Sequence, residues 1–274
     1  MPDEPKPANL QMTNQLKTKR TFHCIGFLTL AIALFCFASP AKSASIVVNG
    51  SFETLVSGNT STSTYGYFCK AGTTCTSNVS GWQSSCNGAT NGCGTGATVV
   101  SLITGGSGGS AFNGNIGFRR AAPNSLDGGN FVGIDGDSTY RAPIWQVINS
   151  LQIGAQYQLS FYQGAAQQAG TSGNTTERWQ VSFGTTTASN PVQLSNLMTL
   201  PDNAPSFWDA QVQKMSFVAT ATTQTLTFLA VGTPQGQPPV VLLDGVSMIQ
   251  TPEPASLVLL GGGLIAIIAI RKRR

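Results

Sequence analysis

Few residues of this 274-residue chain could serve as a general base or a nucleophile. The single histidine, His23, lies in an N-terminal segment that we expect to be removed from the mature protein. Catalytic Ser-His-Asp and Cys-His arrangements need an imidazole, so neither is expected after this removal. Eight acidic residues remain between residues 44 and 250, and a glycosidase needs only two carboxyl groups ~5–9.5 Å apart. Because their spacing singles out no pair, we predict no enzyme, with a carboxylate-based glycosidase as the alternative.

The cysteines offer either disulfide or metal chemistry. Four of the six lie beyond the N-terminal segment, namely Cys69, Cys75, Cys86 and Cys93. In an exported chain an even number of cysteines indicates disulfides, and three pairings are open. The local pairing of Cys69 with Cys75 and of Cys86 with Cys93 is favoured, because each bridge closes a short loop. A four-cysteine zinc site is the alternative, although these spacings are wider than such sites usually have.

Aromatic side chains are the remaining candidates for ligand binding, because sugar rings present apolar C–H faces to flat aromatic rings. Trp82 and Trp208 lie among loop residues, and Tyr140 lies in a predicted turn. These three are the candidate ligand-binding residues. Trp179 lies in a clean alternating strand and is expected in the core, and Trp145 is similarly placed in a strand.

The chain that must position these residues reads as β-strand from residue 44 to residue 249. Apolar residues alternate with polar ones in several segments, and period two indicates one buried and one solvated face. Glycine and proline punctuate the chain, and no long segment has helical periodicity. The sequence predicts an all-β fold, an antiparallel β-sandwich of the jelly-roll type. The expected strands are 46–48, 131–134, 144–148, 157–161, 179–183, 212–218, 226–230 and 240–243.

Residues 55–126 differ from the rest of this domain. Glycine, serine, threonine and asparagine crowd the segment, which also contains all four mature cysteines. We expect a loop-rich insertion with a few short strands, stapled by its disulfides.

The N-terminus has the three-part layout of a secretory signal peptide. Basic residues between positions 17 and 20 precede the apolar run 25–38, and small residues follow up to Ser43. The run of 14 residues would reach only ~21 Å as a helix, too short to span a ~30 Å hydrocarbon core. Residues 1–43 are therefore expected to be a signal helix that is cleaved, and translation could begin at Met12.

The C-terminal segment, residues 250–274, has three parts in order. These are the motif Pro252, Glu253 and Pro254, the apolar run 255–270, and the basic residues Arg271, Lys272, Arg273 and Arg274. The apolar run can insert as a short transmembrane helix of ~24 Å, and the basic cluster would stop transfer. This arrangement resembles the PEP-CTERM sorting signal, which implies recognition by an exosortase and processing near the Pro-Glu-Pro motif. A simple type I membrane anchor is the alternative.

Short motifs spread over the mature domain resemble those of galactose-binding-like jelly rolls, a group that includes many carbohydrate-binding modules. They include Asn49-Gly50-Ser51-Phe52-Glu53 near the start and Leu243-Asp244-Gly245-Val246 at the end. The resemblance implies a structural calcium ion tied by Glu53 and Asp244, with backbone oxygens completing the six to eight ligands. The alternative is that these two carboxylates bond loop amides.

Charge and location complete the sequence-based expectation. The formal net charge of +4 belongs to the two ends, because residues 44–250 hold six basic and eight acidic residues. The positive net charge is therefore no sign of nucleic-acid binding, and no nucleic-acid partner is expected. We expect an exported, exosortase-sorted protein of the cell surface or extracellular matrix that touches the membrane only transiently. A non-catalytic module for extracellular polysaccharide is the expected function. The alternative is a structural or adhesive protein that binds another protein.

Overall fold

The computed structural model describes residues 44–56, 65–67, 79–84, 100–106, 117–188 and 190–251. Every regular element within these ranges is a β-strand, and no helix that could cross a membrane occurs among them. The predicted signal segment, the four mature cysteines and the tail from Pro252 onward lie outside the described residues.

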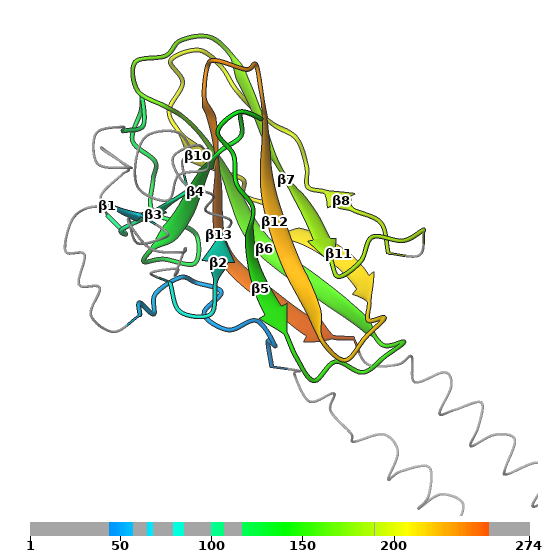
Figure 1. Ribbon diagram of the computed structural model, residues 1–274. Helices are drawn as coiled ribbons and strands as arrows, with labels where there is room; N and C mark the ends of the chain where they lie inside the picture. Colours follow the sequence, from blue (N-terminus) through cyan, green and yellow to red (C-terminus); the bar gives the residue numbers. More distant parts are fainter. Residues whose placement is uncertain are drawn as a thin grey trace, which may run out of the picture. The chain divides into compact units, whose positions relative to one another are not determined.

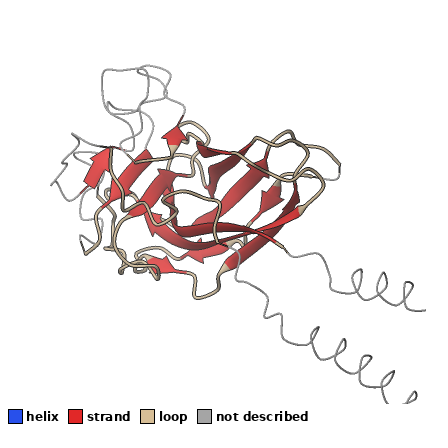
Figure 2. Ribbon diagram, turned by 90° about the horizontal axis from the view of Figure 1, so that it is seen from below, coloured by secondary structure: helices blue, strands red, loops and turns tan. Residues whose placement is uncertain are grey.

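The strands form two antiparallel sheets that face each other as layers (Figures 1 and 2). One sheet has seven strands in the order β1, β3, β4, β13, β6, with β10 and β11 both pairing β6. Its members are β1 (Tyr65–Tyr67), β3 (Val100–Ile103), β4 (Phe131–Asp135), β6 (Gln156–Gln167), β10 (Phe207–Trp208), β11 (Gln213–Val218) and β13 (Pro239–Gln250).

The second sheet has six strands in the order β2, β5, β12, β7, with β8 and β9 both pairing β7. Its members are β2 (Gln83–Ser84), β5 (Ile144–Ile148), β7 (Thr175–Phe183), β8 (Gln193–Leu194), β9 (Met198–Leu200) and β12 (Gln224–Thr233). From β4 to β13 the chain changes sheet repeatedly, as in a jelly roll. The predicted all-β, antiparallel sandwich is confirmed.

Seven of the eight predicted strands are present, and the prediction for residues 46–48 is wrong. The amide of Ile46 donates to the Met248 carbonyl at 2.8 Å, but Val48 bonds the side chain of Gln146 and no partner strand. Asn49 and Phe52 then adopt positive φ angles of 52° and 58°. The segment therefore follows the sheet edge as an irregular loop, because a buried glutamine replaces the backbone partner that a strand would need.

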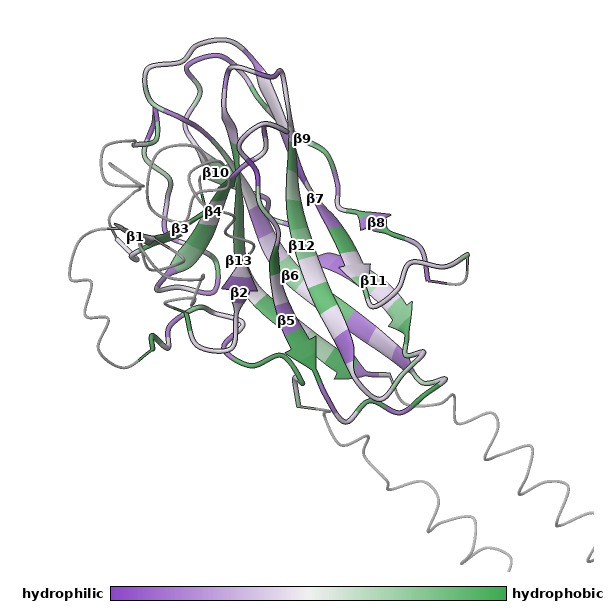
Figure 3. Ribbon diagram, in the orientation of Figure 1, coloured by the Kyte–Doolittle hydropathy of each residue, from purple (hydrophilic) through white to green (hydrophobic). Residues whose placement is uncertain are grey.

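The inward faces of the two sheets make the main core. Along β12 and β7 every second side chain is buried, and Figure 3 shows hydrophobic positions along much of β12. The half-buried, outward Leu229 and Val231 are apolar as well. Phe228 lies at the centre, with the rings of Phe161 and Trp179 edge-on to it at centroid distances of 5.2 and 5.8 Å. Such edge-to-face contacts add to the stabilisation from apolar burial.

A second apolar cluster covers the outer face of the seven-stranded sheet. Phe118 and Ala122 pack there with Phe131 and Trp208, and the Trp208 indole N–H donates to the Pro123 carbonyl at 3.0 Å. Residues 117–123 therefore cover one outer face of the sandwich. On the six-stranded sheet, the outward side chains of β5, β7 and β12 remain half-buried or exposed.

Candidate functional site

A row of outward side chains crosses four strands of the six-stranded sheet. The strand register places Gln83, Trp145, Thr227 and Ser182 side by side on β2, β5, β12 and β7. The Trp145 side chain is half-buried, and its indole N–H donates to Gln83 Oε1 at 3.1 Å. Because this bond fixes the indole against a neighbouring strand, the row presents an aromatic ring flanked by amide and hydroxyl groups.

A cleft of about 350 Å³ lies next to this row. Thr225 and Thr227, outward residues of β12, line it together with residues of the turns that follow β7 and precede β12. Its other lining residues are Gly184, Thr185, Thr220, Ala221, Thr223 and Gln224. Because Thr227 is the cross-strand partner of Trp145, the aromatic ring and the cleft belong to one surface, which we call the Trp145 surface.

The glutamine at the base of the cleft fixes the turn beside it. Gln224 Oε1 accepts from the Thr220 amide at 2.7 Å, and Gln224 Nε2 donates to the Phe183 carbonyl at 3.1 Å. Gln224 is buried, with 5% of its surface exposed. The cleft is therefore held in shape by a buried side chain, and threonines make up most of its lining.

Two of the three predicted ligand-binding aromatics are wrong. Trp82 is 1% exposed and packs between Phe52 and Phe228, with its indole N–H donating to the Asn49 carbonyl. Trp208 is 9% exposed beneath residues 117–123. Each indole N–H is satisfied by a backbone carbonyl, so neither ring offers a face to a ligand.

The other aromatic predictions had mixed outcomes. Tyr140 is 37% exposed in the turn after β4 and does not belong to the Trp145 surface. Trp179 is fully buried in the core, as predicted. Trp145 was also predicted to lie in a strand, but its side chain is on the outward face of the six-stranded sheet. The sequence did not single out this residue for binding.

Glu53 and Asp244 lie on the outer side of the seven-stranded sheet. Asp244, on β13, is fully buried; its Oδ2 accepts from the Ser125 hydroxyl, and its Oδ1 has no hydrogen-bond partner. Burial raises the pKa of Asp244 to about 8, and the negative charges of Asp127 and Glu53 raise it further. The Ser125 hydroxyl opposes this rise, and so does the nearby Gly245 amide, which makes no well-formed hydrogen bond to Oδ1. Asp127 and Glu53 are therefore each near enough to Asp244 to disfavour its ionised form.

The Glu53 carboxylate is held by the loop that leads into β4. Glu53 Oε1 accepts from the Asn130 amide at 2.5 Å. A Cβ atom on Gly129 would lie 1.9 Å from the same oxygen, so only glycine leaves room for the carboxylate at this point.

Calcium fits part of this arrangement. The unpartnered, buried Asp244 Oδ1 is a donor atom of the kind that calcium prefers. Among the described residues, however, no three His, Cys, Asp or Glu side chains come close enough together to hold a metal ion. A calcium ion here would therefore rely on Asp244, Glu53 and backbone oxygens.

Two buried carboxyl groups were not recognised in the sequence. Burial raises the pKa of Glu177 to about 8, and the neighbouring Thr175 hydroxyl opposes this rise without making a well-formed hydrogen bond to it. Burial likewise raises the pKa of Asp135 to about 7. Glu177 takes an inward place in the alternation of β7, which is the one signal that could have identified it.

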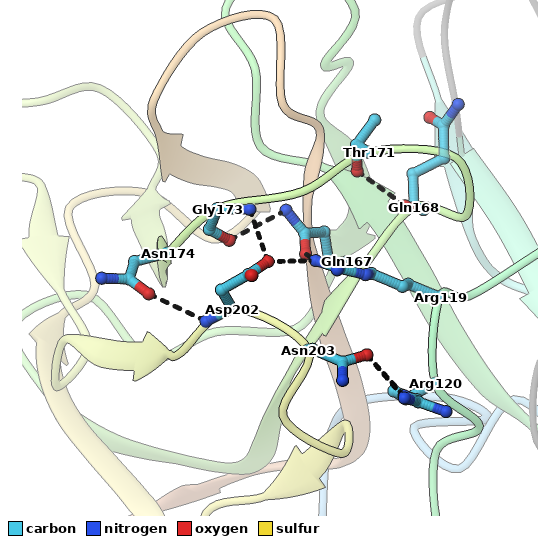
Figure 4. Close-up of polar contacts among 9 residues, drawn as sticks. All are labelled: Arg119, Arg120, Gln167, Gln168, Thr171, Gly173, Asn174, Asp202 and Asn203. Atoms are coloured by element: carbon cyan, nitrogen blue, oxygen red, sulfur yellow. Dashed lines mark hydrogen bonds and ion pairs between the residues drawn. The ribbon is translucent and has the colours of Figure 1, made fainter.

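A polar cluster lies where β6 ends, at residues 167–174 (Figure 4). Asp202 forms an ion pair with Arg119, and its Oδ1 also accepts from the Gly173 amide. Backbone hydrogen bonding from Gly173, followed by the Arg119 contact, lowers the pKa of Asp202. Arg120 donates twice to Asn203 Oδ1, at 3.0 and 2.6 Å. Arg119 and Asp202 neutralise each other, whereas Arg120 is bonded to an uncharged amide. These contacts join the loops at this end of the sandwich.

Comparison with known proteins adds two findings. Residues 250–274 match the family model described as the PEP-CTERM protein-sorting motif. No curated protein matches the chain.

Solved structures similar to this chain include several carbohydrate-binding proteins. A family 61 carbohydrate-binding module in complex with β-1,4-galactotriose is 13% identical, with a TM-score of 0.40 over 76% of this chain and 100% of that one. A putative sugar-binding protein from Bacteroides thetaiotaomicron is 14% identical, with a TM-score of 0.35 over 76% and 100%. The CBM22-2 xylan-binding domain from Paenibacillus barcinonensis is 12% identical, with a TM-score of 0.32 over 64% and 94%.

The sorting motif decides how the chain is handled by the cell. It occupies the same C-terminal residues in which the sequence shows the Pro-Glu-Pro motif, the apolar run and the basic cluster. The chain therefore carries a C-terminal PEP-CTERM sorting motif and is exported as a membrane-anchored precursor that an exosortase processes.

Proposed function

We propose that the mature protein is a non-catalytic binding module for extracellular polysaccharide, and that the Trp145 surface is its binding site. The observation that supports this most directly is the half-buried Trp145 ring beside a cleft lined mostly by threonine residues. An indole face stacks on the apolar C–H face of a sugar, and the surrounding hydroxyl and amide groups bond its hydroxyls.

The charge of the surface indicates the kind of polysaccharide. Gln83, Trp145, Thr227 and Ser182 are uncharged, and so are all the residues that line the cleft. A charged polymer would gain no ion pair there and would lose hydration on binding. A neutral polysaccharide is therefore the ligand class of this site.

A glycan array of neutral and acidic polysaccharides tests this function. The wild-type protein should bind neutral glycans, and Trp145→Ala should weaken that binding at least tenfold with an unchanged melting temperature. Tyr140→Ala is the matched control, since it removes an exposed aromatic ring outside the Trp145 surface. Equal binding by wild type and Trp145→Ala would reject the site, and binding to no glycan at all would reject the function.

The proposal extends to a structural calcium ion at Asp244 and Glu53. The support is the buried Asp244 Oδ1 without a partner, next to two further acidic side chains whose charges raise its pKa. A bound cation would neutralise this repulsion and stabilise the folded state. A thermal melt with and without a chelator tests it, and an unchanged midpoint would argue against a bound ion.

A second candidate function is binding to another protein, and an exposed apolar strip favours it. Leu194 and Leu197 are 49% and 57% exposed, and Val192 and Val212 are 37% and 40% exposed. The Asn196 amide donates to Gln213 Oε1 at 3.0 Å, which holds this segment beside β11. If the strip binds a protein partner, the double substitution Leu194→Asp and Leu197→Asp should abolish retention of the protein on cells. Its binding to glycans should persist.

The mature protein is further proposed to reside at the cell surface or in the extracellular matrix. An exosortase that cuts near the Pro-Glu-Pro motif would release the domain from its anchor. Mass spectrometry of the surface form should then recover no peptide from Leu257–Ile270. Recovery of that peptide would instead indicate a permanent type I membrane protein.

A further inference from the structure

The described chain leaves the sandwich from a well-held point. β13 ends at Gln250, and the amide and the hydroxyl of Thr251 both donate to the Gln156 carbonyl at 2.9 Å. The apolar run of the sorting motif begins at Ala255, four residues further on. Four residues span at most ~14 Å when fully extended. In the membrane-anchored precursor, this end of the sandwich therefore lies next to the bilayer.

The turns around this point are tied to one another. The Gly154 amide, in the turn between β5 and β6, donates to the Ala219 carbonyl at 2.8 Å. The Leu151 amide in the same turn donates to the Thr222 carbonyl at 2.9 Å. We call residues 147–156, 183–188, 218–225 and 249–251 the exit end; it lies where the β13 arrow ends in Figure 1.

The composition of the exit end differs from that of the opposite end. None of its residues, all of which the structure describes, is charged. Ile153, at the tip of the β5–β6 turn, is 63% exposed, and Val147 is 47% exposed. By contrast, the ion pair of Arg119 and Asp202 lies beside Gln167, at the other end of β6.

An uncharged end with an exposed apolar tip suits contact with lipid. Charged side chains are costly to move toward the hydrocarbon, and acidic ones are repelled by anionic headgroups. The exit end has no charged side chain to desolvate or repel. Burial of the Ile153 side chain at the boundary between headgroups and acyl chains is favourable. The hydroxyl and amide side chains of the exit end remain able to bond headgroups.

We propose that the exit end is a membrane-contact surface whose partner is the lipid bilayer itself. In the anchored precursor, Ile153 and the β11–β12 turn lie against the headgroups. Cleavage of the tail then frees this surface. The argument for this contact does not use the polysaccharide function proposed for the Trp145 surface, although the exit end includes residues that line its cleft.

Fluorescence quenching in the full-length precursor tests this surface. The chain is reconstituted in nanodiscs of phosphatidylethanolamine and phosphatidylglycerol that contain brominated acyl chains. A fluorescent amino acid replaces either Ile153 or Tyr140; Tyr140 is exposed near the β12–β13 turn at the opposite end. Quenching should be several-fold stronger at position 153 than at position 140. Equal quenching at the two positions would overturn the proposal.

Two further changes separate true affinity from mere proximity. A linker of about 20 Gly and Ser residues between Thr251 and Pro252 gives the tether a root-mean-square length of ~25 Å. Quenching at position 153 should survive this change, and its loss would show that only the short tether held the domain near lipid. Thr222 is exposed, so Thr222→Glu places a negative charge on the exit end and should lower the quenching at position 153 several-fold. Thr222→Gln, the uncharged control, should leave the quenching unchanged. Equal quenching in the two variants would also refute the membrane-contact surface.

Discussion

Replacement of Asp244 by asparagine should remove a pH dependence that the metal-free protein shows. The Asp244 side chain is fully buried, and its pKa is raised from 3.8 to about 8, chiefly by burial. Between pH 4 and pH 8 the unfolded chain has lost this proton while the folded chain keeps it. The folded state thus binds more protons, so its free energy of unfolding falls as the pH rises through this range.

The size of the effect follows from the width of that range. A full proton difference changes the free energy of unfolding by ~1.4 kcal/mol per pH unit, or ~4 kcal/mol between pH 5 and pH 8. Relaxation and water entry around a buried charge reduce this upper limit, so we expect a decrease of about 2–3 kcal/mol from Asp244. Glu177 and Asp135 act in the same direction, but they are present in both proteins and cancel in the difference.

Urea denaturation of wild type and Asp244→Asn at pH 5 and pH 8, with a chelator present, measures this difference. The stability of the wild type should fall by about 2–3 kcal/mol more than that of the variant. Millimolar calcium should restore the wild type at pH 8, where binding of the cation offsets the cost of ionising Asp244, and should leave Asp244→Asn unchanged. The exposed Asp202→Asn is the control. Parallel pH profiles for wild type and Asp244→Asn would refute the reasoning about burial at this site.

Further outcomes follow from the core and the surface. Glu177→Gln should reduce the pH dependence of the free energy of unfolding by a similar amount, because burial also raises the pKa of Glu177 to about 8. The same pH dependence in Glu177→Gln and wild type, with chelator present, would contradict this prediction. Phe228→Ala should cost about 3–5 kcal/mol in urea denaturation, because it empties the centre of the aromatic core, and a loss below 1 kcal/mol would contradict this packing. Arg119→Ala should lower the free energy of unfolding by no more than about 1 kcal/mol, because its ion pair with Asp202 is partly exposed. A larger decrease in urea denaturation would show that Arg119 has a structural role.

The strands could be predicted because their periodicity is local. In β7 the side chains of Thr175, Glu177, Trp179, Val181 and Phe183 alternate inward, and the sequence around Trp179 shows this directly. The same rule was uninformative in β5, where both faces carry apolar residues. Gln146 points inward there because it bonds both the amide and the carbonyl of Val48, and this turns Trp145 outward. A single sequence gives no sign that the Gln146 side chain takes the place of a backbone partner for Val48.

The burial of Trp82 and Trp208 could not be predicted for a related reason. Both residues follow loop-like sequence, yet Trp82 contacts Phe228 in the core, and the Trp208 indole bonds Pro123. Each contact joins parts of the chain far apart in the sequence, so burial depends on which segment covers which sheet. The pairing of Ser125 with Asp244 is of the same kind. Local pattern thus located the strands, whereas long-range contacts decided which aromatic residue is accessible.

The threonine cleft and the exit end share residues, and this connects the two proposals. Thr220, Ala221 and Thr223 line the cleft, and the turn that holds them is bonded to the turn that carries Ile153. If the exit end rests on lipid in the precursor, headgroups cover the approach to the cleft from that side. Cleavage of the tail would then expose the complete Trp145 surface. If both proposals hold, a polymer would reach the complete Trp145 surface only after the anchor is cut.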